Sequence, residues 1–300
     1  MKILRVFPRK TNATPVDDLS VVGEPPALLE PREDVSEIHV SVAFTFDIDR
    51  ACDLAELWTK KYPGVPVLVG GPGMNHPGGD FVPGRYLANG YVITSRGCPN
   101  NCWFCSVPSR EGRTVIELPV TSGCNVLDDN LLACSKEHIG EVWSMLHGQK
   151  RAGNRVEFTG GLESARLNHF HMSMLSSLKP KQVFFAYDTP NDLEPLHIAG
   201  GMCQQYRLSR DSLRCYVLCG WPSMTGRNAD TTEQAHKRML CAARAGFLPM
   251  AMLYADKAGH TAADTSDDWA KLQRTWTRVP AMKAVIRREL GNEVTKGVLL

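Results

Sequence analysis

The sequence predicts an α/β protein in which a small βαβ unit precedes a partial barrel of six β/α units. Strand candidates alternate with helical patterns six times between residues 91 and 254, as expected for a parallel sheet with helical crossovers. One shorter strand-helix-strand alternation fills the first 85 or so residues. A loop rich in Gly and Pro follows, to about residue 84. We therefore expect three parts, at residues 1–88, 89–255 and 256–300.

The first region contains one clearly amphipathic helix between apolar strands at 3–7, 38–44 and 65–69. Its apolar positions follow the i, i+3, i+4, i+7 spacing of one helix face: Ala51, Leu54, Ala55 and Trp58. Asp47 or Asp49 can cap the start of this helix. Pro63-Gly64 ends it.

The second region supplies the six β/α units. Two of its helices have marked starts: Ser135 precedes an apolar stripe through residues 139–146, and Asp230 with Glu233 forms a capping box before residues 235–245. The last residues, 256–300, form a helical extension broken at Pro280. The six strand candidates are residues 91–95, 124–128, 155–159, 182–187, 214–220 and 248–254.

Composition excludes several classes of protein. The chain of 300 residues is 43% hydrophobic, enough for a sizeable core, and its 34 basic residues nearly balance 32 acidic ones, so net charge gives it no general attraction to nucleic acid. No apolar run approaches the roughly 20 residues of a membrane helix, and the opening residues do not form a secretory signal. We expect a cytoplasmic protein without a membrane partner, whose ten cysteines are reduced or bind metal.

Three of these cysteines carry the most specific signal. Cys98, Cys102 and Cys105 follow the first strand of the second region with the spacing C-x3-C-x2-C. Three thiolates from one short loop can bind three irons of a [4Fe-4S] cluster and leave the fourth iron without a protein ligand. That iron can take the amino and carboxylate groups of S-adenosylmethionine, SAM. A zinc site is the weaker interpretation, because it requires four closed ligands.

The motif, with Phe104 before its last cysteine, resembles that of the radical SAM superfamily. The resemblance covers roughly residues 90–255 and implies a partial (β/α)6 TIM-like barrel. It implies an enzyme that cleaves SAM reductively at the cluster, producing a 5′-deoxyadenosyl radical, with electrons from an external donor such as flavodoxin or ferredoxin. It also implies that Phe104 packs on the adenine of SAM. The substrate is not implied and can be a small molecule or a macromolecule.

Two segments compete for contact with the SAM amino group. Asp128 and Asp129 resemble the end of strand 2 in related branches of the superfamily, but they can equally cap the next helix. Gly160 and Gly161, with Glu163, resemble the superfamily's usual strand 2 signature, yet our strand count assigns them to strand 3, where two glycines can simply form a tight turn.

Two charged residues complete the predicted SAM site. Arg166 stands where family members place a basic residue against the SAM carboxylate, although it can equally pair with a surface carboxylate. Asp188 ends strand 4, where related chains place a polar group near the ribose. We interpret the other seven cysteines as buried or isolated thiols. Among them, Cys219 is the strongest candidate for a role in a site, because it lies at the C-terminal end of its strand.

The first region resembles a shortened flavodoxin-like domain of the kind that precedes the barrel in cobalamin-dependent members. Its first strand leads into Pro8-Arg9-Lys10, with no Asp-x-His-x-x-Gly loop, so we expect no bound cobalamin. A methylthiotransferase is disfavoured as well. That branch holds a second cluster with three cysteines in this domain, and here Cys52 stands alone.

A second hypothesis is a non-catalytic Fe-S or zinc protein that senses redox state or binds nucleic acid. Its support is the basic C-terminal region, where two tryptophans can stack on bases and the basic residues around them can contact phosphate. An amphipathic helix that closes the open side of the barrel explains the same residues more simply. The residues concerned are Trp269, Lys271, Arg274, Trp276, Arg278, Lys283, Arg287 and Arg288.

Overall fold

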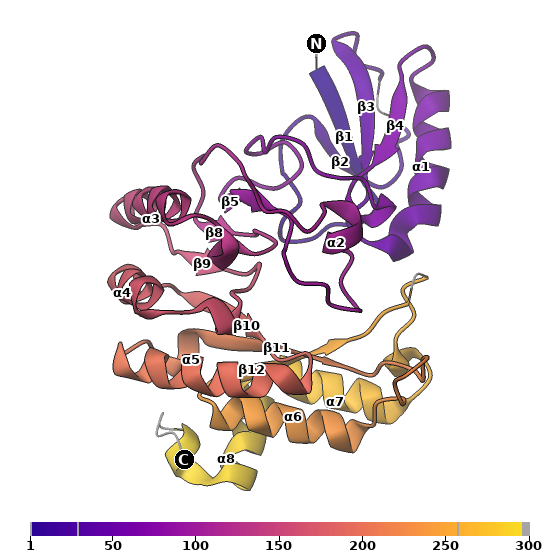
Figure 1. Ribbon diagram of the computed structural model, residues 1–300. Helices are drawn as coiled ribbons and strands as arrows, with labels where there is room; N and C mark the ends of the chain where they lie inside the picture. Colours follow the sequence, from indigo (N-terminus) through magenta and orange to yellow (C-terminus); the bar gives the residue numbers. More distant parts are fainter. Residues whose placement is uncertain (1, 29, 257, 296–300) are drawn as a thin grey trace. The chain divides into compact units, whose positions relative to one another are not determined.

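The computed structural model describes residues 2–28, 30–256 and 258–295 (Figure 1). The chain divides into two compact units. Unit 1 comprises Met1–Gly123 with Lys257–Gly259, and unit 2 comprises Cys124–Asp256 with His260–Leu300. The boundary that the sequence suggests near residue 88 lies inside unit 1.

Unit 1 is built on a parallel sheet with the strand order β2-β1-β3-β4. The predicted βαβ alternation is present as β1 (Lys2–Phe7), β3 (Val35–Ser41), α1 (Ile48–Lys61) and β4 (Val67–Gly70). The additional strand β2 (Ser20–Val22) was not predicted, because three residues are too few for a visible alternation. Further along lie β5 (Tyr91–Val92), β6 (Ser95–Arg96), α2 (Val107–Arg110) and β7 (Ile116–Glu117).

The predicted apolar face of α1 packs on this sheet. Ala51, Leu54 and Trp58 are buried with the inward residues of β1 and β3, and each large side chain contributes roughly 1.5–3 kcal/mol by burial. The Trp58 indole donates to the Gly23 carbonyl at 3.1 Å. The cap prediction was wrong: the Asp47 side chain makes no cap hydrogen bond.

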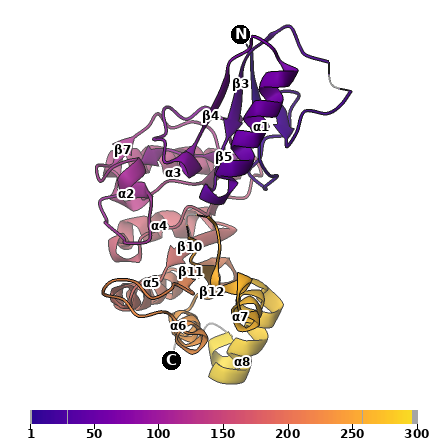
Figure 2. The ribbon, with the colours of Figure 1, turned by 90° about the vertical axis from the view of Figure 1, so that its right-hand side faces the viewer.

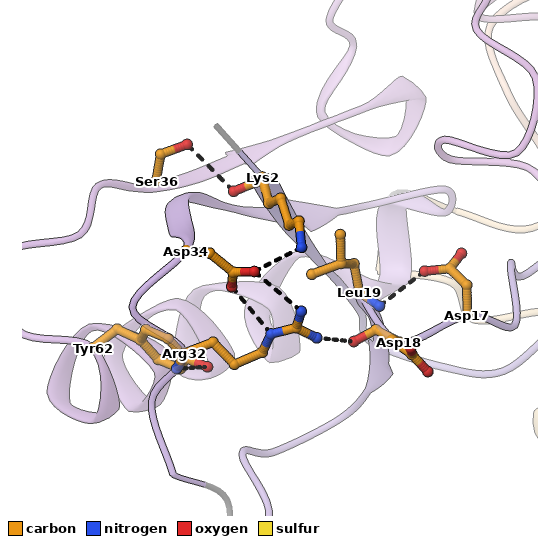
Figure 3. A network of polar contacts seen from close by, with 8 residues as sticks. All are labelled: Lys2, Asp17, Asp18, Leu19, Arg32, Asp34, Ser36 and Tyr62. Carbon is orange, nitrogen blue, oxygen red and sulfur yellow. Dashed lines mark hydrogen bonds and ion pairs between the residues drawn. The ribbon is translucent and has the colours of Figure 1, made fainter.

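Charged side chains fasten the beginning of β1 to the loop before β3 (Figure 3). Asp34 accepts from Lys2 at 2.7 Å and from Arg32 at 3.2 Å, and these bonds, led by that from Lys2, lower the pKa of Asp34 to about 2. Because these groups are exposed to water, the pairs add little to stability.

Unit 2 is a series of parallel strands alternating with helices, which confirms the α/β class. Its strands lie in the order β12-β11-β10-β9-β8, all paired in parallel. With β5 of unit 1, all six predicted strands are present. The elements are β8 (Asn125–Val126), α3 (Lys136–Arg151), β9 (Glu157–Phe158), α4 (His169–Leu178), β10 (Gln182–Ala186), α5 (Leu193–Gln205), β11 (Leu213–Cys219), α6 (Thr232–Arg244) and β12 (Leu248–Leu253).

Helix starts in unit 2 follow the prediction once and depart from it once. Ser135 caps α3, its hydroxyl accepting from the His138 amide at 3.1 Å. At α6 the cap is Thr231, which accepts from the Gln234 amide at 3.2 Å. The predicted cap, Asp230, is fully engaged elsewhere, as described below.

The C-terminal extension consists of α7 (Asp267–Thr277) and α8 (Val279–Thr295), and the backbone leaves helical geometry at Gly291. The interruption before Pro280 was predicted. Both helices contact β12 and α6 (Figure 2), and Trp276 and Ile286 are buried. Among the described residues, no helix combines the length and the apolar character needed to cross a bilayer.

Candidate functional site

The cysteine loop follows β6 and is held by a close backbone approach at Gly97. This glycine has φ +81°, and a Cβ there would lie 2.3 Å from the Thr114 carbonyl oxygen, so only glycine fits without rearrangement. Cys98 donates its amide to the Gly112 carbonyl at 3.3 Å, and the Arg113 guanidinium donates to the Pro99 carbonyl at 3.0 Å. The loop is thereby pinned to residues 112–114.

The three cysteines of the loop are partly accessible. Cys98, Cys102 and Cys105 are each half-buried, whereas Cys203, Cys215 and Cys219 are buried. The Cys105 amide donates to the Cys102 carbonyl at 3.1 Å, so the last two cysteines share a tight turn. Accessible thiols in one short loop have the donor chemistry of an iron-sulfur site.

The thiols are nevertheless not gathered as a ready ligand set. Within residues 2–28, 30–256 and 258–295, no group of three or more His, Cys, Asp or Glu side chains is placed to hold a metal ion. The residue types and their spacing fit a [4Fe-4S] cluster that Cys98, Cys102 and Cys105 would hold.

Two aromatic rings lie inside the loop. Trp103 and Phe104 meet edge to face, with ring centroids 5.4 Å apart and planes at 85°. Both rings are half-buried. Phe104 therefore keeps part of its surface available for a planar ligand, as its predicted role requires.

In unit 2, the ends of β8 and β9 are in direct backbone contact. A Cβ on Gly160 would lie 2.8 Å from the Asp128 carbonyl oxygen, and the Gly160 amide donates to the Val126 carbonyl at 3.0 Å. The Asn125 side chain accepts from the Thr159 hydroxyl at 2.7 Å. The strand count is confirmed, since residues 128–129 follow β8 and residues 160–161 follow β9.

Glu163 joins the two competing segments. Its Oε2 accepts from the Asn130 side-chain amide at 2.6 Å and from Arg166 Nε at 2.6 Å. The segment at 128–130 and the segment at 160–166 therefore form one polar rim, which we call the β8–β9 rim. Asn130 was not singled out from the sequence; its position within Asp128-Asp129-Asn130 was the available signal. Arg166 does pair with a carboxylate, and 38% of its side chain remains exposed.

Asp188 links the ends of β10 and β11. Its Oδ1 accepts from the Leu218 amide at 3.0 Å. Burial raises the pKa of Asp188 to about 7, although the bond from Leu218 acts in the opposite direction. This carboxyl group therefore changes charge near neutral pH and can donate or accept a proton there.

A buried ion pair beyond β11 was missed by sequence reasoning. Asp230 accepts from the Gly220 amide at 2.9 Å and from both terminal nitrogens of Arg238, at 3.0 and 2.6 Å. The guanidinium of Arg238 also lies 4.7 Å from the centroid of the Trp221 ring and donates to the Leu218 carbonyl at 3.1 Å. The network fixes the backbone just after β11. No local sequence pattern predicts this network.

The thiol at the end of β11 is enclosed. Cys219 is fully buried, and burial raises its pKa to about 12. Cys215 is likewise buried, with a pKa raised by burial. Both thiols are therefore protonated core groups, as the strand pattern predicted.

One of the two C-terminal tryptophans is unavailable for stacking on a base. Trp276 is 1% exposed and packs at 5.4 Å against the ring of His236. Lys283 pairs with Asp211 and Arg288 pairs with Glu289. The two helices pack against β12 and α6.

No model of a known protein family matches the chain, and no curated protein sequence matches it either.

Proposed function

We propose that this protein is a radical SAM enzyme that cleaves SAM reductively at a [4Fe-4S] cluster and directs the resulting 5′-deoxyadenosyl radical at a substrate still to be identified. The observation that carries the proposal is the cysteine loop. It combines the C-x3-C-x2-C spacing with three half-buried thiols and a glycine whose close contact pins the loop directly after a strand.

Cys98, Cys102 and Cys105 would hold the cluster, which supplies the electron for cleavage of the sulfonium. Three protein ligands suit an open iron, because a fourth thiolate would block SAM. The finer architecture belongs to the same proposal: a partial (β/α)6 TIM-like barrel preceded by a flavodoxin-like unit. A reducing compartment such as the cytoplasm and an external donor such as flavodoxin or ferredoxin suit this chemistry.

The protein's own contribution would be to bind and orient SAM. Phe104 would cover the adenine, and the β8–β9 rim, with Asp128, Asp129, Gly160 and Gly161, would receive the amino group. Arg166 would meet the SAM carboxylate. This role requires Arg166 to share its guanidinium between Glu163 and the ligand, which its partial exposure permits. Asp188 would accept a hydrogen bond from a ribose hydroxyl.

Unit 1 would carry no cobalamin. The turn after β1 presents Arg9 instead of a histidine, and its guanidinium takes both carboxylate oxygens of buried Asp47 at 2.6–2.9 Å. The same guanidinium lies 4.6 Å from the centroid of the Phe46 ring. The protein's own side chains thus occupy the end of β1. Gel filtration after incubation with hydroxocobalamin tests this, because a stoichiometric corrinoid absorption band in the protein peak would make radical methylation the leading function.

The deciding experiment is anaerobic reconstitution with iron and sulfide, followed by reduction with dithionite in the presence of SAM. We expect a brown protein with about four irons per chain and 5′-deoxyadenosine in the chromatogram. Cys98→Ala/Cys102→Ala/Cys105→Ala should lose both, while Cys52→Ala, a change at an exposed cysteine, should keep both. Full iron and sulfide in the triple variant would refute the ligand assignment. Stoichiometric zinc without SAM cleavage would favour the non-catalytic alternative.

A further inference from the structure

A small basic cavity lies in unit 2 at the edge where the parallel strands begin. It has a volume of about 20 Å³ and is lined by Arg210, Asp211, Leu248, Lys283 and Ile286. Arg210 and Asp211 precede β11, Leu248 begins β12, and the last two residues belong to α8. The β8–β9 rim and Asp188 follow strand ends instead, so this cavity lies at the opposite edge of the sheet.

Arg210, one of the residues that line the cavity, carries an unpaired donor. Its Nη2 donates to the Ala243 carbonyl at 2.6 Å, but its Nη1 is buried and has no acceptor in the described part of the chain. Burial lowers the pKa of Arg210 to about 10. A buried guanidinium N–H without an acceptor is costly, and an oxyanion would remove that cost.

Arg214, which belongs to β11 and is not itself a lining residue of the cavity, carries a second unpaired donor. It is 8% exposed, its pKa is lowered by burial, and its Nη1 also lacks an acceptor among the residues described. Arg214 is in register with Leu248 across β11 and β12. Partners in register project from the same face of a sheet, so Arg214 projects from the same face as Leu248, a residue that lines the cavity.

The protein's own carboxylate does not neutralise these arginines. Asp211 raises the pKa of both Arg210 and Arg214 by its charge, yet its hydrogen bond goes to Lys283, at 2.5 Å. Asp211 is 70% exposed, so water screens it. Two cations, Arg210 and Lys283, therefore line the cavity with one carboxylate, and Arg214 projects from the same face of the sheet as Leu248.

We propose that this pocket binds the phosphoryl oxyanion of a small ligand, either inorganic phosphate or a phosphate monoester. Guanidinium groups match phosphate oxygens in geometry and form charge-assisted hydrogen bonds with them. A cavity of about 20 Å³ holds little more than one water-sized group. It thus admits one oxygen of the anion, and the remainder of the ligand lies towards Lys283 and solvent. The site is independent of the proposed SAM chemistry.

Equilibrium dialysis of the full chain with radiolabelled phosphate tests the proposal, at constant ionic strength maintained with chloride. We expect saturable binding that Arg210→Met and Arg214→Met each weaken at least about tenfold, the effect of losing one charge-assisted hydrogen bond. Lys237→Met is the matched control, because Lys237 pairs with Glu233 on the exposed side of α6, and it should bind like wild type. Phenyl phosphate, with phenol as its control, distinguishes a monoester from the free anion as the preferred source.

Two results would overturn the proposal. One is the absence of saturable binding of both phosphate and phenyl phosphate to the wild type; the other is binding that both methionine variants keep within about twofold of wild type. If Arg214→Met does not fold, Arg210→Met at the less buried position decides alone. A purely structural role would instead change the melting temperature of the variants while leaving the phosphate-dependent increase in that temperature intact.

Discussion

Asn130 donates its side-chain amide to the Glu163 carboxylate at 2.6 Å, and this bond connects the turns after β8 and β9. The two residues are 33 positions apart. The contact turns two segments that looked like competitors in the sequence into one polar rim. It also gives Glu163 a definite task, which is to hold Asn130 and Arg166 together at the carboxyl ends of these strands.

The first prediction is energetic coupling between Asn130 and Glu163. In a double-mutant cycle with Asn130→Ala and Glu163→Gln, the two changes should couple by about 1 kcal/mol in the free energy of unfolding, because they share one charge-assisted hydrogen bond. Urea denaturation under reducing conditions measures this. Asn154→Ala, at a residue that instead donates to Gln149, should show no coupling with Glu163→Gln. If the free-energy changes are additive in both cycles, Glu163 does not stabilise the fold through its hydrogen bond with Asn130.

The second prediction concerns SAM affinity, which tests the β8–β9 rim directly. Arg166→Ala should weaken SAM binding to the reconstituted protein by about tenfold or more, since a hydrogen bond to a charged group contributes roughly 1.5–3 kcal/mol. Asp128→Asn/Asp129→Asn should do the same through the amino group while leaving iron content unchanged. The matched control is Arg155→Ala, at an exposed position. Unchanged SAM affinity in both test variants would indicate that SAM instead contacts Gly160, Gly161 and Glu163.

The third prediction is a pH-dependent stability contribution from Asp188. Its folded pKa, about 7, lies above the unfolded value of about 3.9, so the folded state retains a proton that the unfolded state has lost. The contribution of Asp188 to the free energy of unfolding is therefore largest below about pH 4. It decreases as the pH rises to about 7, by at most about 4 kcal/mol. Asp188→Asn keeps an acceptor for the Leu218 amide but does not titrate.

The gain in stability of Asp188→Asn over wild type should therefore be larger at pH 8 than at pH 5. Chemical denaturation at the two pH values measures it. Asp53→Asn, at an exposed position on α1, should show the same difference from wild type at both. A pH-independent difference for Asp188→Asn would mean that this carboxyl group does not carry the raised pKa.

Local patterns succeeded where packing alone decides the structure and failed where a distant charge intervenes. The 3.6-residue period placed Ala51, Leu54 and Trp58 correctly in the core, because burial of one helix face is a local property of the sequence. Asp47 and Asp230 each precede a helix and were therefore predicted as caps. Both carboxylates instead bind an arginine, Arg9 or Arg238.

The candidate site likewise has one part that the sequence predicts and another that only the structure reveals. The cysteine loop is visible in the sequence because its three cysteines lie within one short segment. The Asn130–Glu163 contact and the attachment of Asp188 to the Leu218 amide connect residues 33 and 30 positions apart. They arise only when parallel strands bring their ends together, so no local spacing could reveal them.

The fourth prediction is that the Asp230–Arg238 pair stabilises the segment after β11. Arg238→Met leaves a buried carboxylate whose own exposure is 0% without its counter-ion, and such a loss typically costs about 3–5 kcal/mol. Lys237→Met, which removes an exposed pair at the preceding residue, should cost much less. Hydrogen exchange of the Gly220 amide should accelerate in the first variant alone. Equal effects of the two changes would show that the buried pair is not structural.

The last prediction tests whether the backbone at Gly97 shapes the cysteine loop. Gly97→Ala would place a Cβ 2.3 Å from the Thr114 carbonyl oxygen, in addition to the strain of φ +81°. The alanine variant should therefore displace the loop and lose most of its iron after reconstitution. Gly112→Ala provides a matched control in the same loop region. Gly112 has nearly the same φ, +86°, but a Cβ there would meet nothing within 4 Å, so this variant bears only the backbone strain, about 1–2 kcal/mol, and should keep its iron. Equal iron contents in the two variants would show that the contact between Gly97 and Thr114 does not determine whether the loop binds iron.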